Sequence, residues 1–230
     1  MHRTRIKICG LTRAEDLHAA VAAGADALGF VFYARSPRYL TPAQAAALMH
    51  AAPPFVSTVA LFVNPTLDQV RTVAAVAPFQ QLQFHGDEDE GQCAAIAAAL
   101  NKPFLRAFRV KPDTSAADLL ECEHRYRAAS PLFSGLLLDT YVDAYGGAGK
   151  VFDWSLIPKE LAPRVVLSGG LSVPNATDAV LRVRPYAVDI SSGVEAQKGI
   201  KDAHKIAAFV RAVRAADATI ESENANERRT

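Results

Sequence analysis

The sequence predicts an α/β protein built as a single (β/α)8 TIM barrel. Two observations favour this fold. Short apolar runs alternate with longer segments that repeat Ala, Leu and Val at helical spacing, and the alternation occurs eight times within 230 residues. This order is typical of parallel strands joined by crossover helices. We expect a catalytic barrel domain over residues 1–215 and a polar, disordered tail over 216–230.

The predicted elements follow one another with short connections. An open, doubly wound sheet has the same alternation, so the number of units favours a closed barrel without proving it. A Gly-rich segment at 141–150 interrupts the pattern, and we expect it to be a flexible cover. The predicted strands are 5–9, 27–32, 58–63, 82–85, 104–108, 136–139, 165–168 and 187–190. The predicted helices are 13–23, 42–51, 67–77, 88–100, 116–127, 154–161, 174–183 and 202–215.

Composition and charge narrow the choice of partners. The chain has 25 basic and 24 acidic residues, a formal net charge of +1, so no global field favours nucleic acid or an anionic membrane. The first residues lead directly into a predicted strand, without the apolar run of a signal peptide. We expect a cytoplasmic protein with a small-molecule substrate, and the sequence does not distinguish a monomer from a homodimer.

The three cysteines are an odd number without paired spacing. Neither a disulfide framework nor a zinc site is indicated, and we expect no metal. Cys93 and Cys122 lie within predicted helices, where packing explains them. Cys9 instead ends the first predicted strand.

Active sites of barrels of this kind lie at the carboxyl ends of the strands. The polar residues there are Cys9, Gln83, His85, Asp139 and Asp189. Each has a structural alternative, because an unpaired thiol is usually packed in a core and an aspartate can cap a loop. As functional groups, a thiolate serves as a base, and a partly desolvated carboxyl group serves as an acid.

Glycine-rich segments follow the last two predicted strands, where barrels often bind phosphate through backbone amides. The candidate phosphate ligands are Gly169, Gly170, Ser192 and Gly193. Neither segment is a G-x-G-x-x-G or Walker loop, so dinucleotides and nucleoside triphosphates are not indicated. Arg38, in a loop stiffened by Pro37, is a candidate ligand for a carboxylate.

Taken in order, these motifs closely resemble the phosphoribosylanthranilate isomerase family over about residues 5–214. The matching segments are KICGLT at 7–12, GFVF at 29–32, SPRY at 36–39, FVN at 62–64, QFHG at 83–86, LDT at 138–140, GGAGK at 146–150, FDW at 152–154, LSGGL at 167–171 and DISSGVE at 189–195.

The resemblance implies an isomerase of tryptophan biosynthesis that works without a cofactor. It would convert N-(5-phosphoribosyl)anthranilate to its 1-deoxyribulose 5-phosphate isomer by an Amadori rearrangement. Carried over by motif, Cys9 would be the general base, Asp139 the general acid, and Arg38 the ligand of the anthranilate carboxylate. Gln83, His85 and Asp189 would line the substrate site, and the amides around Gly170, Ser192 and Gly193 would hold the phosphate.

Two other classes share some of these features. Another phosphosugar barrel, such as an indole-glycerol-phosphate synthase or a ribulose-phosphate epimerase, would share the phosphate loops. The synthase would call for catalytic lysines, and the epimerase for metal-binding His and Asp residues, whereas the strand ends here offer a thiol and a carboxyl group. A binding barrel without catalysis would not require both Cys9 and Asp139.

Overall fold

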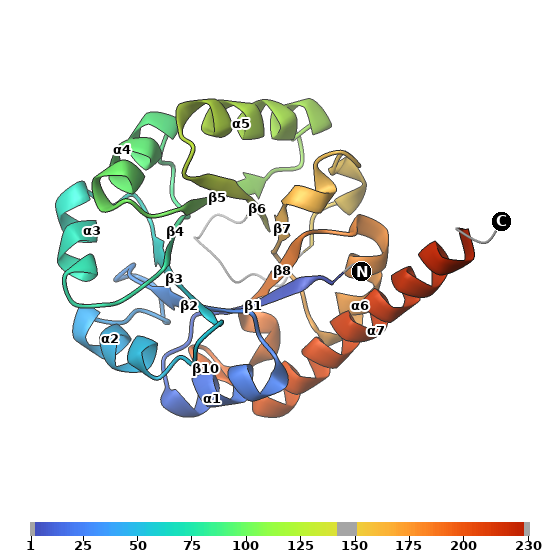
Figure 1. The fold of residues 1–230 in the computed structure, drawn as a ribbon, viewed down its shortest axis with the longest axis horizontal. Helices are drawn as coiled ribbons and strands as arrows, with labels where there is room; N and C mark the ends of the chain where they lie inside the picture. The colour runs from blue at the N-terminus through green and yellow to red at the C-terminus, as the bar shows by residue number, and fades with distance from the viewer. Residues whose placement is uncertain (1–2, 142–150, 228–230) are drawn as a thin grey trace.

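The computed structural model describes residues 3–141 and 151–227, and it confirms the predicted closed barrel. The parallel strands pair in chain order, and the last strand also pairs with the first, which closes the sheet (Figure 1). The strands are β1 (Arg5–Cys9), β2 (Ala27–Val31), β3 (Ser57–Phe62), β4 (Gln81–Phe84), β5 (Phe104–Val110), β6 (Phe133–Thr140), β7 (Val166–Leu167) and β8 (Ala187–Ile190).

The helices surround the barrel (Figure 1). Several begin with a capping box, in which the N-cap side chain and the side chain three residues later each accept a backbone hydrogen bond, as at Thr41 and Gln44. The helices are α1 (Ala14–Ala23), α2 (Pro42–His50), α3 (Leu67–Ala74), α4 (Glu90–Leu100), α5 (Ala116–Ala129), α6 (Ala176–Val183) and α7 (Ala203–Glu227).

Two connections differ from the sequence-based expectation. The helix predicted at 154–161 is replaced by two 3-10 turns, η1 (Trp154–Leu156) and η2 (Ala162–Arg164), because Pro158 and Pro163 cannot donate the hydrogen bonds of a continuous helix. After β8 the chain forms a 3-10 turn, η4 (Ser192–Val194), and a small antiparallel hairpin that was not predicted. Its strands are β9 (Glu195–Gln197) and β10 (Ile200–Lys201).

Residues of β1 alternate between two environments. Ile6 and Ile8 are fully buried in the main core between the barrel and the helices. Lys7 and Cys9 face the barrel interior, because successive strand residues point to opposite sides. The interior also holds two small apolar clusters, one of Leu105, Ala107, Leu137, Val166 and Ala187, the other of Cys9, Val31 and Leu61.

Helix α7 extends well past the predicted end of the domain (Figure 1, red). Val213, Ala216 and Ile220, at helical spacing, are buried in the main core. The expectation of a disordered tail at 216–230 is therefore wrong for 216–227, which is helical. The many polar side chains on the solvent face of this helix obscure the helical spacing of its apolar residues in the sequence. Residues 228–230, and residues 142–150 of the cover expected over 141–150, lie outside the described residues. None of the helices described combines the length and apolar character that crossing a membrane requires.

Asp217 fixes this part of α7 to the start of the barrel. Its carboxylate accepts hydrogen bonds from the Thr4 backbone N–H at 3.1 Å and the Thr4 hydroxyl at 2.7 Å. Arg214 donates to the same carboxylate at 2.9 Å. The buried carboxylate thus joins α7 to the residue before β1.

We predict that Asp217→Ala lowers the free energy of unfolding by about 2–4 kcal/mol, because it removes the carboxylate that accepts from the buried N–H and hydroxyl of Thr4 and takes away one of the acceptors of Arg214. Urea unfolding monitored by circular dichroism measures the change. The matched control is Glu223→Ala on the same helix, whose pair with Arg184 is about half exposed and contributes about 0–1 kcal/mol. Equal losses in the two variants would contradict the anchoring role.

Candidate active site

The structure places the predicted strand-end residues at one mouth of the barrel. Cys9 ends β1, Gln83 lies near the end of β4 with His85 directly after that strand, Asp139 lies near the end of β6 and Asp189 lies within β8. Because all eight strands are parallel and the sheet is closed, these ends face a common space. The polar contacts divide the residues into three groups.

The first group is a buried ion pair beside Cys9. The Nζ of Lys7 lies 2.8 Å from Oδ1 of Asp189, and both side chains are nearly inaccessible. The two residues are register partners across β1 and β8. The Ser168 hydroxyl donates to the second oxygen of Asp189 at 3.4 Å. A Cβ at Gly29 would lie 2.8 Å from the Cys9 Sγ and 3.0 Å from the Lys7 Nζ, so glycine makes room for both.

The electrostatics of this group keep Lys7 charged. Burial alone would lower the pKa of Lys7, but Asp189 and Cys9 outweigh it and raise that pKa above its ordinary value. Burial raises the pKa of the Cys9 thiol, the Lys7 ammonium opposes this rise, and Asp189 adds to it. Lys7 is therefore the main cation stabilising any thiolate formed at Cys9.

The second group surrounds Asp139. Nε2 of His85 lies 3.0 Å from Oδ2 of Asp139, and Nδ1 of His85 lies 3.0 Å from the amide nitrogen of Gln83. The Thr140 N–H donates to Oδ1 of Asp139 at 2.9 Å. Gly169 has a φ of +78°, and a Cβ there would lie 2.7 Å from the same Oδ1. Glycine thus allows the loop after β7 to approach Asp139.

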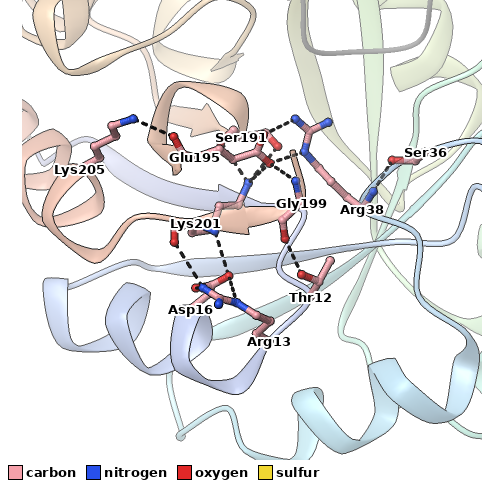
Figure 2. A network of polar contacts seen from close by, with 10 residues as sticks. All are labelled: Thr12, Arg13, Asp16, Ser36, Arg38, Ser191, Glu195, Gly199, Lys201 and Lys205. Carbon is pink, nitrogen blue, oxygen red and sulfur yellow. Dashed lines mark hydrogen bonds and ion pairs between the residues drawn. The ribbon is translucent and has the colours of Figure 1, made fainter. Parts of the chain in front are cut away.

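The third group is centred on Arg38, which lies beside Gly10, the residue after Cys9. The Arg38 side chain crosses Gly10, where a Cβ would lie 2.3 Å from the Arg38 Cδ. Its guanidinium forms a bidentate pair with Glu195, with Nε to Oε1 at 2.6 Å and Nη2 to Oε2 at 2.8 Å (Figure 2). The predicted carboxylate ligand therefore already holds a carboxylate of the protein.

The predicted phosphate loops follow β7 and β8. Gly169 and Gly170 both have positive φ, +78° and +67°, a conformation that glycine adopts without strain. Gly193 packs so closely on the Leu171 carbonyl that a Cβ would lie 2.0 Å from its oxygen. Four loop N–H groups have no hydrogen-bond acceptor among the described residues, those of Gly169, Gly170, Ser192 and Gly193. Backbone N–H groups of this kind are suited to an anion.

Sequence reasoning missed Lys7, Glu195 and Lys201. A signal for Lys7 was present, because it lies two residues before Cys9 on β1 and its side chain therefore points to the same, inward side of the strand. Glu195 and Lys201 lie on the short hairpin of β9 and β10, whose sequence has no periodicity that would predict pairing.

The other two cysteines fit the packing interpretation. Burial raises the pKa of Cys93 to about 12 and that of Cys122 to about 11, which makes both thiols unreactive near neutrality. Within the described residues, no group of three or more His, Cys, Asp or Glu side chains is placed to hold a metal ion.

Comparison with known proteins gives consistent results. Residues 6–212 match the family described as N-(5'phosphoribosyl)anthranilate (PRA) isomerase. The N-(5'-phosphoribosyl)anthranilate isomerase of Herminiimonas arsenicoxydans is 70% identical over 223 residues, which cover 97% of this chain and 98% of that protein. The enzyme of the same name from Dechloromonas aromatica is 58% identical over 218 residues, covering 95% of this chain and all of that protein (100%).

Solved structures agree. The crystal structure of phosphoribosyl anthranilate isomerase from Thermotoga maritima superposes with a TM-score of 0.81 at 40% identity, covering 92% of this chain and 99% of that one. A structure of such an isomerase with reduced 1-(o-carboxyphenylamino)-1-deoxyribulose 5-phosphate has a TM-score of 0.78 at 38% identity, with the same coverage of 92% and 99%. The chain therefore belongs to the N-(5'-phosphoribosyl)anthranilate isomerase family.

Proposed function

We propose that this isomerase converts N-(5-phosphoribosyl)anthranilate to 1-(2-carboxyphenylamino)-1-deoxyribulose 5-phosphate, with Cys9 as the general base and Asp139 as the general acid. Family membership supports the reaction and its place in tryptophan biosynthesis. The observation that carries the two roles is placement: Cys9 on β1 and Asp139 on β6 approach one barrel mouth from strands that are not neighbours. The two groups can therefore reach different parts of one substrate. Proton transfers alone accomplish the rearrangement, so the proposal requires no cofactor.

Asp139 protonates the furanose ring oxygen. The bond from that oxygen to C1 then breaks, and the nitrogen lone pair forms a C1–nitrogen double bond. The environment of Asp139 suits both of its protonation states, because the roles of the two His85 nitrogens depend on the tautomer. With the Gln83 amide nitrogen donating to Nδ1, the imidazole Nε2–H donates to the carboxylate. With that amide rotated, Nδ1–H donates to its oxygen and Nε2 accepts from the protonated acid.

Cys9 then removes the proton from C2. The electrons of the C2–hydrogen bond form a C1–C2 double bond, and the C1–nitrogen pair returns to nitrogen, giving an enol that tautomerises to the ketone. Cys9 gains one proton and Asp139 loses one, so exchange with solvent restores the enzyme. The Lys7 ammonium supports the thiolate, and we propose that Asp189 acts on the site by holding that ammonium.

The ends of the substrate are bound by different loops in this proposal. The backbone amides of Gly169, Gly170, Ser192 and Gly193, which have no acceptor within residues 3–141 and 151–227, bind the phosphate, and Arg38 binds the anthranilate carboxylate. Gln83 and His85 line the space between them. Binding both ends fixes the reacting carbons relative to the acid and the base.

The decisive experiment for the function is a fluorescence assay with freshly generated phosphoribosylanthranilate. Rearrangement alters the surroundings of the anthranilate fluorophore and should change its emission in proportion to enzyme concentration. If the purified protein gives no change while a characterised isomerase does, the proposed reaction is wrong.

We predict that Cys9→Ser and Asp139→Asn each lower kcat by about 10²–10⁴, the usual contribution of one acid or base, with little change in KM. The same fluorescence assay measures both constants. Cys122→Ser, a thiol substitution away from the site, is the matched control and should retain its activity. Near-normal turnover in either active-site variant would overturn the assigned role.

Lys7→Met should shift the pH dependence of kcat/KM. Removing the ammonium takes away the main charge that favours the thiolate, so the pKa of Cys9 rises further and the limb that requires the thiolate moves to higher pH. A pH–rate profile measures the shift. Lys102→Met makes the same change in net charge far from Cys9 and should leave the profile in place; equal profiles for all three proteins would refute the role of Lys7.

Arg38→Ala should raise KM more than it lowers kcat, because the guanidinium contacts the carboxylate and not the reacting carbons. We expect KM to increase by about 10-fold or more, consistent with loss of a charge-assisted pair. An unchanged KM would show that Arg38 serves only to neutralise Glu195.

A further inference from the structure

We infer that Glu195 and Lys201 are positioning residues for the substrate carboxylate, which hold Arg38 in place and leave its guanidinium with an uncompensated positive charge. This role rests on the proposed function, in which Arg38 binds the anthranilate carboxylate. Three observations support it: the contacts of Lys201, the charge of the group, and the free edge of Arg38.

Lys201 is completely buried and contacts the same oxygen as Arg38. Its Nζ lies 3.0 Å from Oε1 of Glu195, the atom that also accepts from Nε of Arg38. The Lys201 ammonium further donates to the backbone oxygen of Ser191 at 3.0 Å and to the Ser191 hydroxyl at 3.2 Å. One carboxylate is thus held between two cations, and only Arg38 has a partly exposed side chain (11%).

The charges of the group sum to +1 when all three residues are ionised. Burial raises the pKa of Glu195, but the hydrogen bond from Arg38 and the charge of Lys201 outweigh it and leave that pKa below its ordinary value. Burial lowers the pKa of Lys201, and Glu195 opposes this. A pair of Arg38 and Glu195 alone would be neutral and would attract an anion weakly. Lys201 restores the positive charge from a position that the substrate cannot reach.

Glu195 occupies only one edge of the guanidinium. It takes the Nε and one Nη2 hydrogen, so the other Nη2 hydrogen and the Nη1 group remain. Among the described residues, Nη1 has no acceptor. The remaining edge is formed by Nη1 and Nη2. Its two parallel N–H donors can bind the two oxygens of a second carboxylate.

The hairpin that carries Glu195 and Lys201 is fixed to the barrel (Figure 2). The Lys201 N–H donates to Asp16 of α1 at 3.0 Å, and Asp16 is itself paired with Arg13. The Lys205 ammonium donates to the Glu195 backbone oxygen at 2.8 Å. These contacts fix the position of Glu195. Glu195 in turn fixes the orientation of the Arg38 guanidinium. The Arg13–Asp16 pair is neutral and does not change the sum of charges.

The test compares two ligands by isothermal titration calorimetry. One is reduced 1-(o-carboxyphenylamino)-1-deoxyribulose 5-phosphate, and the other is the same compound with an unsubstituted phenyl ring. We expect Lys201→Met to raise the Kd of the carboxylated ligand roughly tenfold, since a unit charge several ångströms away is lost. The Kd of the phenyl ligand should rise much less, because that ligand retains only the phosphate, whose loop loses the contact of Lys201 with Ser191. Lys201→Gln, which keeps a donor for Glu195, serves as a second variant if Met lowers the Tm.

A charge rescue distinguishes positioning from general damage. In Lys201→Met/Glu195→Gln the group again carries +1, and the substituted amide keeps one oxygen that can accept from Arg38. Affinity for the carboxylated ligand should therefore recover part of the loss seen in Lys201→Met, and the part not recovered reports the positioning by the second carboxylate oxygen. If Lys201 and Glu195 had only a structural role, the double variant would bind the carboxylated ligand more weakly than either single variant. Equal loss of affinity for both ligands, or no loss, would overturn the inference. Wild-type protein that fails to turn over phosphoribosylanthranilate would instead refute the proposed function itself.

Discussion

Closure of the sheet between β1 and β8 is the constraint on which the site depends. It brings Lys7 and Asp189, which are 182 residues apart in the chain, into a single buried pair beside Cys9. In an open sheet these two strands would be edges, and each charge would face solvent or an unrelated partner. Closure also turns every strand end toward one mouth, so that groups from different strands lie around one space.

The interior of this mouth is polar, and its charges are stable there because each one has a partner. An isolated ion in such an environment would be strongly unfavourable. Lys7 is paired with Asp189, Glu195 with Arg38 and Lys201, and Asp139 with His85. Three of the close approaches require glycine, because a Cβ at Gly10, Gly29 or Gly169 would strike a side chain of the site. The conformational freedom of glycine is used at Gly10 and Gly169, whereas Gly29 supplies only space.

Much of this arrangement could be predicted from the sequence, because it follows from periodicity and from strand ends. The bounds of β1 and β8 matched their predicted ranges, and the polar residues that end the strands were found by position alone. What escaped prediction depends on tertiary contact. Glu195 and Lys201 can be linked to the site only once the fold shows that Arg38 crosses Gly10. The end of α7 is helical because Ala216 and Ile220 are buried in the core. The helix predicted at 154–161 contains Pro158, whose nitrogen has no hydrogen to donate, and this local effect replaces it with 3-10 turns.

The hairpin of β9 and β10 places the support of Arg38 in a different part of the chain from the proposed acid and base. The proposed acid and base belong to the barrel strands, whereas the support of Arg38 comes from an appendage after β8. If Arg38 binds the anthranilate carboxylate as proposed, a change in that hairpin acts first on substrate binding, because Cys9 and Asp139 belong to β1 and β6. Under the proposed function, substrate selection and proton transfer therefore depend on separate segments of one chain.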